Sequence, residues 1–391
     1  MRRISAQYIF TSAGEPLKRG VVTVADDNSV VSVEDTGGSL TESSSVEFYN
    51  GIIIPGLVNC HCHLELSHMH NAVPGGGGLG DFIRAVRETR AASDEEIQAA
   101  AQEADSEMFL AGIMACGDIS NNSLTFDIKS KSRIAYTTFI EVFGVDTLKA
   151  QKRIEDAEVV AAAAAAAGLR HHITPHAVYS VSRSLFTLLL QHISPASLTS
   201  LHFLESADER EALSRRRGRI MDSYRSLGIG PENIDTPTDH ITTALTLAAR
   251  TGHLITVHNT CIEAEEVSAL NASGNVWFCL CPSSNLHISG AMPPVRLLLA
   301  ATEHIVTGTD SLASSGQLSI LSEMRLLQEN FPDVPLDEII RWGTVNGARA
   351  LQMHDTLGSI EPGKKPGLLL IDDMDLAEML LLPQSRVRRL L

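Results

Sequence analysis

Two histidines one residue apart form the first group in this sequence that could do chemistry. His61 and His63 come directly after an apolar run that starts at Ile52. Alternate side chains of a strand point to the same face, so we expect both imidazoles to lie together at the strand's carboxyl end. Imidazole nitrogens placed in this way can bind one metal ion. A His-x-His pair alone does not define a metal site, so further ligands are required.

Three later apolar runs also end in side chains that bind metals. His202 lies late in one run, His258 ends the next, and Asp310 ends the last. Each of these residues, taken alone, is more often a polar residue with local hydrogen bonds than a ligand. Four strand ends that all carry His or Asp are much harder to explain in that way. The set predicts a site for Zn²⁺ or Fe²⁺ with open positions for water.

Eight short apolar runs, separated by helical stretches, must position these residues. The predicted strands are 52–60, 111–119, 134–143, 170–176, 197–204, 253–258, 276–282 and 304–310. Alternating strands and helices are typical of a parallel sheet, and eight such units over about 300 residues predict an α/β fold with a closed (β/α)₈ barrel. Barrel enzymes build their active sites at the carboxyl ends of the strands, where the candidate ligands lie.

The two chain ends have a different pattern of apolar and polar residues. Residues 1–50 are short alternating runs that predict antiparallel strands, and residues 364–371 return to the same pattern. We therefore expect a small β-sandwich domain formed by residues 1–54 and 356–391, with the barrel in 55–355. Predicted helices include 81–90, an alanine-rich helix that Gly168 ends as a C-cap, and 336–351.

Composition restricts the class of partner. The chain has 391 residues with 31 basic and 47 acidic side chains, a net charge of −16. Such a surface repels phosphate backbones and anionic lipid, so we expect a small-molecule substrate, with no nucleic acid and no membrane as partners. The chain has no apolar run of 18 residues and no secretory signal, so we expect a cytoplasmic protein. Six cysteines form no disulfide framework, and a homodimer is left open.

The strand-end residues resemble those of the amidohydrolase superfamily. The segment from Pro55 to Glu65 is similar to the family's first-strand motif. The His-x-x-Glu pattern of His202 and Glu205, followed by His258 and Asp310, resembles the branch that deaminates heterocycles and nucleosides. Residues 344–351 and 358–365 are similar to the closing helix and the return to the small β domain, so the resemblance covers nearly the whole chain.

This resemblance implies a role for each residue. The implied metal ligands are His61, His63, His202 and Asp310; the implied catalytic residues are Glu205, His258 and Asp310. The implied substrate contacts are His176 and Asn285, although Asn285 could equally cap a turn. Two-metal members use a lysine of the fourth strand, and residues 170–180 contain none. We therefore expect one divalent ion, with zinc first and iron as the alternative.

The implied reaction is hydrolytic deamination of an aminated N-heterocycle or nucleoside, with water attacking the C–NH₂ carbon and ammonia leaving. The nucleoside-type members, aminofutalosine deaminase among them, look most similar. One alternative is hydrolysis of a cyclic amide or an aryl chloride at the same metal site. Another is a metal-binding protein without turnover, against which the Glu205 and His258 pair argues.

Two segments and a set of arginines have open roles. The charged stretch 207–240 is either a lid or a solvated helix, and Gly75 to Gly80 is expected to be a flexible loop near the site rather than a dinucleotide loop, because no strand precedes it. An anionic tail on the substrate would need a cation. Arg84, Arg87 and Arg215 to Arg217 are candidates for that contact.

Overall fold

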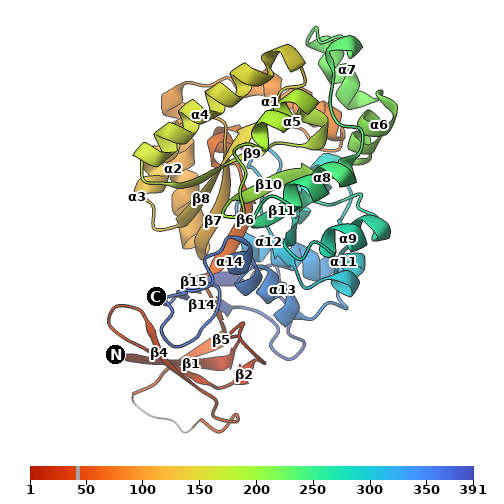
Figure 1. The fold of residues 1–391 in the computed structure, drawn as a ribbon. Coiled ribbons are helices and arrows are strands. Elements are labelled where there is room, and N and C mark those ends of the chain that lie inside the picture. The colour runs from red at the N-terminus through yellow and green to blue at the C-terminus, as the bar shows by residue number, and fades with distance from the viewer. Residues whose placement is uncertain (41–44) are drawn as a thin grey trace.

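The computed structural model describes residues 1–40 and 45–391. Both chain ends meet in one seven-stranded sheet, at the bottom of Figure 1 beside the two termini. The strand order is β15-β14-β5-β1-β3-β4, with β2 paired to β1. The strands are β1 Arg2–Ile9, β2 Leu17–Lys18, β3 Val21–Val24, β4 Val30–Glu34, β5 Glu47–Pro55, β14 Leu368–Asp372 and β15 Arg386–Arg389. The pairs β1–β2, β1–β3 and β3–β4 are antiparallel as expected, whereas β5 runs parallel to β1.

Eight further strands, all parallel, form the predicted barrel. They are β6 Leu57–Cys62, β7 Ile113–Ser120, β8 Ala135–Val142, β9 Arg170–Pro175, β10 Leu198–Phe203, β11 His253–His258, β12 Val276–Leu280 and β13 Ile305–Thr307. They pair as two four-stranded sheets, β6 to β9 and β10 to β13. Bridges between Ala177 and His202 and between Cys62 and Asp310 join the two sheets at both seams. The (β/α)₈ prediction is confirmed.

Helices surround these strands (Figure 1). They are α1 Leu79–Thr89, α2 Asp94–Leu110, α3 Phe126–Lys131, α4 Ala150–Ala166, α5 Arg183–Leu189, α6 Ala207–Arg215, α7 Arg219–Ser226, α8 His240–Ala248, α9 Ala264–Asn271, α10 Pro282–Ser289, α11 Val295–Ala301, α12 Ile320–Asn330, α13 Leu336–Trp342 and α14 Val345–Ala350, with short 3-10 helices at Leu64–Met69, Thr147–Lys149, Val178–Ser180 and Pro231–Asn233. Gly168 follows α4 with φ +70°, the left-handed conformation that ends many helices. Among the described residues, no helix combines the length and the apolar character needed to cross a membrane.

Two predicted elements are divided. Residues 52–55 belong to β5 of the small sheet, and the first barrel strand starts only at Leu57. Between them the N–H of Gly56 donates to the Pro366 carbonyl, and a Cβ at this glycine would lie 2.4 Å from that oxygen. The predicted helix 336–351 is broken at Gly343 and Thr344 into α13 and α14, because Thr344 has a non-helical backbone (φ −134°, ψ −96°). We propose a division between the small sheet and the barrel at residues 54/55 and 355/356; the first point lies one residue before the end of β5 at Pro55.

Candidate active site

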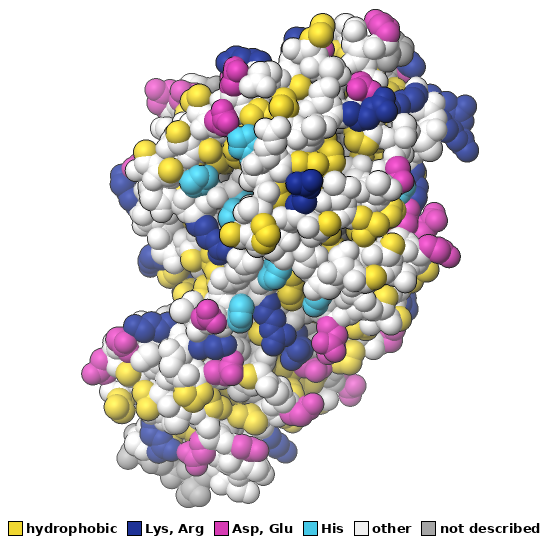
Figure 2. Space-filling model, viewed as in Figure 1, with side chains coloured by type: hydrophobic (Ala, Val, Ile, Leu, Met, Phe, Trp, Pro, Cys, Tyr) yellow, Lys and Arg dark blue, Asp and Glu magenta, His cyan; other side chains and the backbone are white. Residues whose placement is uncertain are grey.

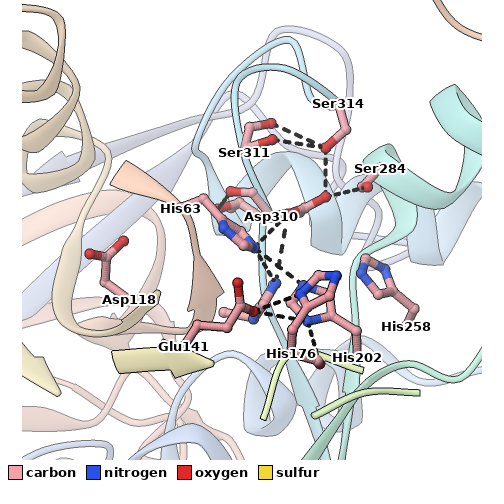
Figure 3. A network of polar contacts seen from close by, with 12 residues as sticks. His63, Asp118, Glu141, His176, His202, His258, Ser284, Asp310, Ser311 and Ser314 are labelled. Atoms are coloured by element: carbon pink, nitrogen blue, oxygen red, sulfur yellow. Dashed lines mark hydrogen bonds and ion pairs between the residues drawn. The ribbon is translucent and has the colours of Figure 1, made fainter. Parts of the chain in front are cut away.

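Three imidazoles meet at the carboxyl ends of β6 and β10 (Figure 3). The Nε2 atom of His63 lies 3.2 Å from Nε2 of His61 and 3.3 Å from Nε2 of His202. Asp310, which follows β13, adds its Oδ1 atom at 3.4 Å from His63 Nε2 and 3.6 Å from His61 Nε2. All four side chains are buried. The structure therefore brings together the four residues that the sequence indicated as ligands.

The chemistry of this cluster suits a metal ion. Burial lowers the pKa of His61, His63 and His202, that of His63 to about 4, so all three imidazoles are neutral at pH 7. His202 donates its Nδ1–H to the His176 carbonyl (3.0 Å), which leaves the Nε2 lone pair toward the cluster. A tetrahedral ion with ligands at about 2.1 Å keeps its ligand atoms about 3.4 Å apart. The observed spacing of 3.2–3.6 Å fits that requirement.

Two serines fix the orientation of Asp310. Its Oδ2 atom accepts hydrogen bonds from the hydroxyls of Ser284 and Ser314, each at 2.6 Å, which leaves Oδ1 facing the histidines (Figure 3). Burial favours the neutral acid, but the neighbouring histidines outweigh this effect and hold the pKa of Asp310 well below its usual range. The carboxylate is therefore ionised. The sequence analysis did not identify either serine, although Ser284 lies in the segment that leads to Asn285.

A second pair of ionisable side chains lies beside the cluster. The Nε2 atom of His258 is 3.8 Å from Oε1 of Glu205, and both side chains are buried. Burial, with the charge of Asp310, raises the pKa of Glu205 to about 8, so this carboxyl holds a proton at neutral pH. Glu209, which the sequence analysis missed, accepts a hydrogen bond from the backbone N–H of Glu205 at 3.0 Å.

Glu141 is a further buried carboxylate that sequence reasoning missed. Its Oε1 atom lies 2.8 Å from Nδ1 of His176, and Asn121 donates to its Oε2 atom at 3.2 Å. Burial opposes charge on both partners, but their mutual attraction raises the pKa of His176 and lowers that of Glu141 to about 2. The contact with Glu141 therefore favours the cationic form of His176, which lines the cavity. Glu141 lies near the carboxyl end of the third barrel strand, as the other site residues lie near the ends of theirs. This position is a signal that could have identified it.

A cavity of about 560 Å³ lies over these groups. His176, Glu205, His258 and Asp310 all line it. Residues of α1 and α7 form part of its wall. The two segments also contact each other, because Arg219 of α7 donates to the Gly77 carbonyl and lies 3.1 Å from Asp81. The segments 75–80 and 207–240 therefore meet beside the site, and a lid movement by either of them remains a prediction.

Some predicted contacts lie elsewhere. Asn285 does not line the cavity; its Oδ1 atom lies 2.9 Å from Nδ1 of His258. Arg84 pairs with Asp81 at 2.9 Å and also lies outside the lining, whereas Arg87 is part of it. Arg215 to Arg217 are absent from the lining too; Figure 2 shows Lys and Arg side chains grouped over α6 and α7, where Arg216 donates to Thr236. These arginines lie away from the cavity because α6 and α7 turn them toward solvent or toward their own segment.

The barrel and its strand-end cluster define a (β/α)₈ fold with a candidate metal site at the carboxyl ends of its strands. Residues 52–387 match the amidohydrolase family, and the chain belongs to this family. It is 28% identical to the adenosine deaminase of Helicobacter pylori over 82% of this chain and 79% of that protein.

Two solved structures have the same fold. Helicobacter pylori aminofutalosine deaminase in complex with methylthio-coformycin superimposes with a TM-score of 0.79 at 23% identity, covering 96% of this chain and 93% of that one. The zinc complex of atrazine chlorohydrolase from Arthrobacter aurescens gives a TM-score of 0.69 at 18% identity, over 94% and 86% of the two chains. The predicted family resemblance is confirmed.

Proposed function

We propose that this protein is a metal-dependent hydrolytic deaminase that acts on an aminated N-heterocycle or nucleoside. The observation that carries the proposal is the position of Glu205: its buried carboxyl lies 3.8 Å from Nε2 of His258 and lines the same cavity as the cluster of ligand side chains. Deamination needs a proton donor for a ring nitrogen and a base for water, and this arrangement supplies both. The similarity to a protein named adenosine deaminase and to aminofutalosine deaminase supports the same class of substrate.

The proposed ligands of one divalent ion are His61, His63, His202 and Asp310. Strand β9 has no lysine that could bridge a second ion. Zinc is our first choice because neutral imidazoles and a carboxylate suit it and a structural neighbour contains zinc, with iron as the alternative. A bound ion of this kind lowers the pKa of water from 15.7 toward about 7 and so supplies a nucleophile at neutral pH.

The protein's own residues would carry the protons. Asp310 is ionised and its Oδ1 atom faces the cluster, so it accepts a hydrogen bond from the attacking water and orients it. Glu205 donates its proton to the ring nitrogen next to the attacked carbon. His258 has a free Nε2 lone pair, because its Nδ1–H donates to Asn285, so it accepts a proton from water and passes it to the leaving amine. The second water proton returns to Glu205 as the carbonyl forms and ammonia leaves. His176, whose Nδ1 atom contacts Glu141, binds the substrate through Nε2.

A second candidate function is hydrolysis of an aryl chloride, which the structural similarity to atrazine chlorohydrolase favours. Cyclic-amide hydrolysis is the other reaction that the same ligands could support. An amine needs a proton on its nitrogen to leave, which the pair of Glu205 and His258 can supply, whereas chloride leaves without one; the pair therefore favours deamination.

The test is a screen of the purified protein for ammonia release with adenosine, 5′-methylthioadenosine, guanine, cytosine and amino-triazines, together with elemental metal analysis. We expect ammonia from at least one purine nucleoside and close to one zinc or iron per chain. A protein that is fully loaded with metal and releases chloride from chloro-triazines, but no ammonia from any amine, would replace the proposal with the second candidate.

A further inference from the structure

The start of α6 carries a sequence pattern for helix capping that the structure does not complete. Ser206 is the N-cap residue and Glu209 follows three residues later, which is the spacing of a capping box. In a capping box the serine hydroxyl accepts from the glutamate N–H, and the glutamate carboxyl accepts from the serine N–H. Here the buried hydroxyl of Ser206 has no hydrogen-bond partner in the described part of the chain. The carboxyl of Glu209 accepts instead from the N–H of Glu205, one residue before the cap, at 3.0 Å.

The same motif forms a complete capping box at the start of α2. The N–H of Ser93 donates to Oε2 of Glu96 at 2.8 Å, and the N–H of Glu96 donates to the Ser93 hydroxyl at 3.2 Å. Both of these residues are exposed, whereas Glu209 is fully buried and its Oε1 atom has no hydrogen-bond partner among residues 1–40 and 45–391. Burial of a carboxyl with an unpartnered oxygen costs free energy. Helix capping therefore does not explain the position of Glu209.

The N–H that Glu209 binds belongs to a sharp turn at the end of β10. Leu204, the residue before Glu205, has φ +50°, a left-handed conformation that is uncommon for a bulky residue. Its carbonyl accepts from the N–H of Cys261 at 2.9 Å, so this side of the turn has an anchor of its own. The carboxyl of Glu205 lies 3.8 Å from His258, which is longer than a hydrogen bond. Its direction therefore depends on the backbone of the turn, which Glu209 holds on the other side.

We propose that Glu209 is a positioning residue, which fixes the backbone N–H of Glu205 and thereby directs the carboxyl of Glu205 into the cavity. The inference rests on the proposed deaminase function, in which Glu205 donates a proton. Glu209 is not one of the described residues that line the cavity, so it acts through Glu205 and not on the substrate. A displacement of about 1 Å at a reacting group can cost about 10²-fold in rate. Loss of the acceptor at Glu209 therefore lowers kcat and leaves KM and metal content nearly unchanged.

Three replacements of Glu209 separate its hydrogen bond from its shape. Burial raises the pKa of Glu209 to about 8, so the carboxyl is neutral at pH 7 and Glu209→Gln keeps both its charge and an acceptor. We expect this variant to retain most of the activity. Glu209→Met keeps the length without the acceptor and should lose about 10- to 100-fold in kcat. Glu209→Asp is too short to reach the N–H and should lose as much, so it replaces Glu209→Met if that variant does not fold.

The matched control is Glu96→Met. It removes the corresponding glutamate of the α2 capping box, and with it a hydrogen bond to a backbone N–H, at an exposed helix start. We expect kcat and KM of this variant to equal those of the unmodified protein.

A double-mutant cycle with Glu205→Gln tests whether Glu209 acts through Glu205. Once the proton donor is replaced, its direction no longer matters, so adding Glu209→Met to Glu205→Gln should lower kcat no further. A general contribution of Glu209 to the fold would instead lower kcat by the same factor in both backgrounds. Equal factors in the two backgrounds, or a normal kcat in both Glu209→Met and Glu209→Asp, would overturn the proposal.

Amide hydrogen exchange of the metal-loaded protein makes the test independent of turnover. We expect the N–H of Glu205 to exchange at least 10-fold faster in Glu209→Met than in the unmodified protein or in Glu96→Met, because it has lost its acceptor. If this acceleration is observed but no amine releases ammonia, only the proposed reaction is wrong and the positioning of Glu205 by Glu209 stands. If the exchange of this N–H is unchanged in Glu209→Met, the positioning role is wrong, whatever the reaction.

Discussion

The Nδ1 atom of His258 lies 2.9 Å from the amide oxygen of Asn285, and both side chains are buried. An amide oxygen can only accept, so the imidazole donates from Nδ1 and keeps a lone pair on Nε2, the atom that lies toward Glu205. The sequence offered Asn285 as a substrate contact or a turn cap. The structure gives it a contact with His258, and we infer that it orients this proposed base.

Replacement Asn285→Leu should therefore slow the reaction without removing the metal. The variant keeps the side-chain volume but loses the acceptor, and we expect kcat to fall about 10- to 100-fold. Elemental analysis checks that metal content is unchanged. Asn271→Leu is a matched control, because that exposed asparagine of α9 donates only to the Ala301 carbonyl. Normal turnover in Asn285→Leu would show that His258 does not need this partner.

Glu205→Gln should remove the proton donor and leave the ligand cluster intact. General acid catalysis contributes about 10²- to 10⁴-fold, so we expect kcat to fall by that factor while the protein still binds its metal. The measurement is ammonia release beside metal content. A Glu205→Gln variant with a near-normal rate would exclude Glu205 as the acid.

The pH profile gives an independent check of Glu205. Burial raises its pKa to about 8, so the proton it donates is present below this pH and is lost above it. We expect kcat/KM to decrease as pH rises through about 8, and the residual activity of Glu205→Gln to lack this decrease. A profile of the unmodified enzyme that stays flat through this range would contradict the assignment.

Metal removal should destabilise the protein, because binding to the folded state alone adds to the free energy of unfolding. We expect dialysis against a chelator to lower Tm, and one equivalent of zinc to restore it. His63→Ala should have a lower Tm than the unmodified protein even without chelator, and added zinc should not raise it. His68→Ala is the matched control: His68 belongs to the nearby pair His68 and His70, is half-buried, and hydrogen-bonds the Arg90 carbonyl. A Tm that does not respond to zinc would argue against a site at His63.

The sequence predicted the site residues at strand ends better than the residues whose role depends on contacts between distant parts of the chain. His61, His202 and Asp310 could be placed together because parallel strands bring their carboxyl ends to one edge of the barrel. Glu141 had the same kind of position but no partner close in sequence, so it was missed. Arg84 and Arg87 could not be told apart, because a rotation of α1 decides which one faces the cavity. The break at Gly56 depends on Pro366, more than 300 residues away.

The buried ion pair of Asp118 and Lys129 should hold the metal-binding end of β6 in place. Both side chains are fully buried, and Asp118 also accepts a hydrogen bond from the N–H of Leu64, the residue after His63, at 2.7 Å. Lys129→Met leaves an uncompensated buried charge, and we expect it to lower the free energy of unfolding by about 3–5 kcal/mol and to weaken metal binding.

The double variant Asp118→Asn with Lys129→Met removes both charges and should recover much of this loss. Urea unfolding of the four proteins in the cycle measures the coupling between the two side chains. Additive effects of the two replacements would show that the pair is not coupled in this way.

Glu323 of α12 should make the stability of the protein depend on pH. It is fully buried; its Oε2 atom accepts from the N–H of Ser283 at 2.9 Å, and its Oε1 atom is without a hydrogen-bond partner in the described part of the chain. Burial raises its pKa from 4.5 to about 8. The folded state therefore keeps a proton that the unfolded chain releases between these two values. As pH rises across that interval this group lowers the free energy of unfolding, by at most about 1.4 kcal/mol per pH unit, and the effect levels off above about 8.

Glu323→Gln cannot lose a proton, so its free energy of unfolding should vary less with pH than that of the unmodified protein. Urea unfolding at about pH 6 and about pH 8.5 measures the free energy of unfolding of both proteins. We expect the difference, variant minus unmodified protein, to shift in favour of the variant at the higher pH. Glu329→Gln removes an exposed carboxylate from the same helix and should leave the pH dependence as it is. Parallel pH dependences of Glu323→Gln and the unmodified protein would mean that this carboxyl is already ionised in the folded state at pH 6.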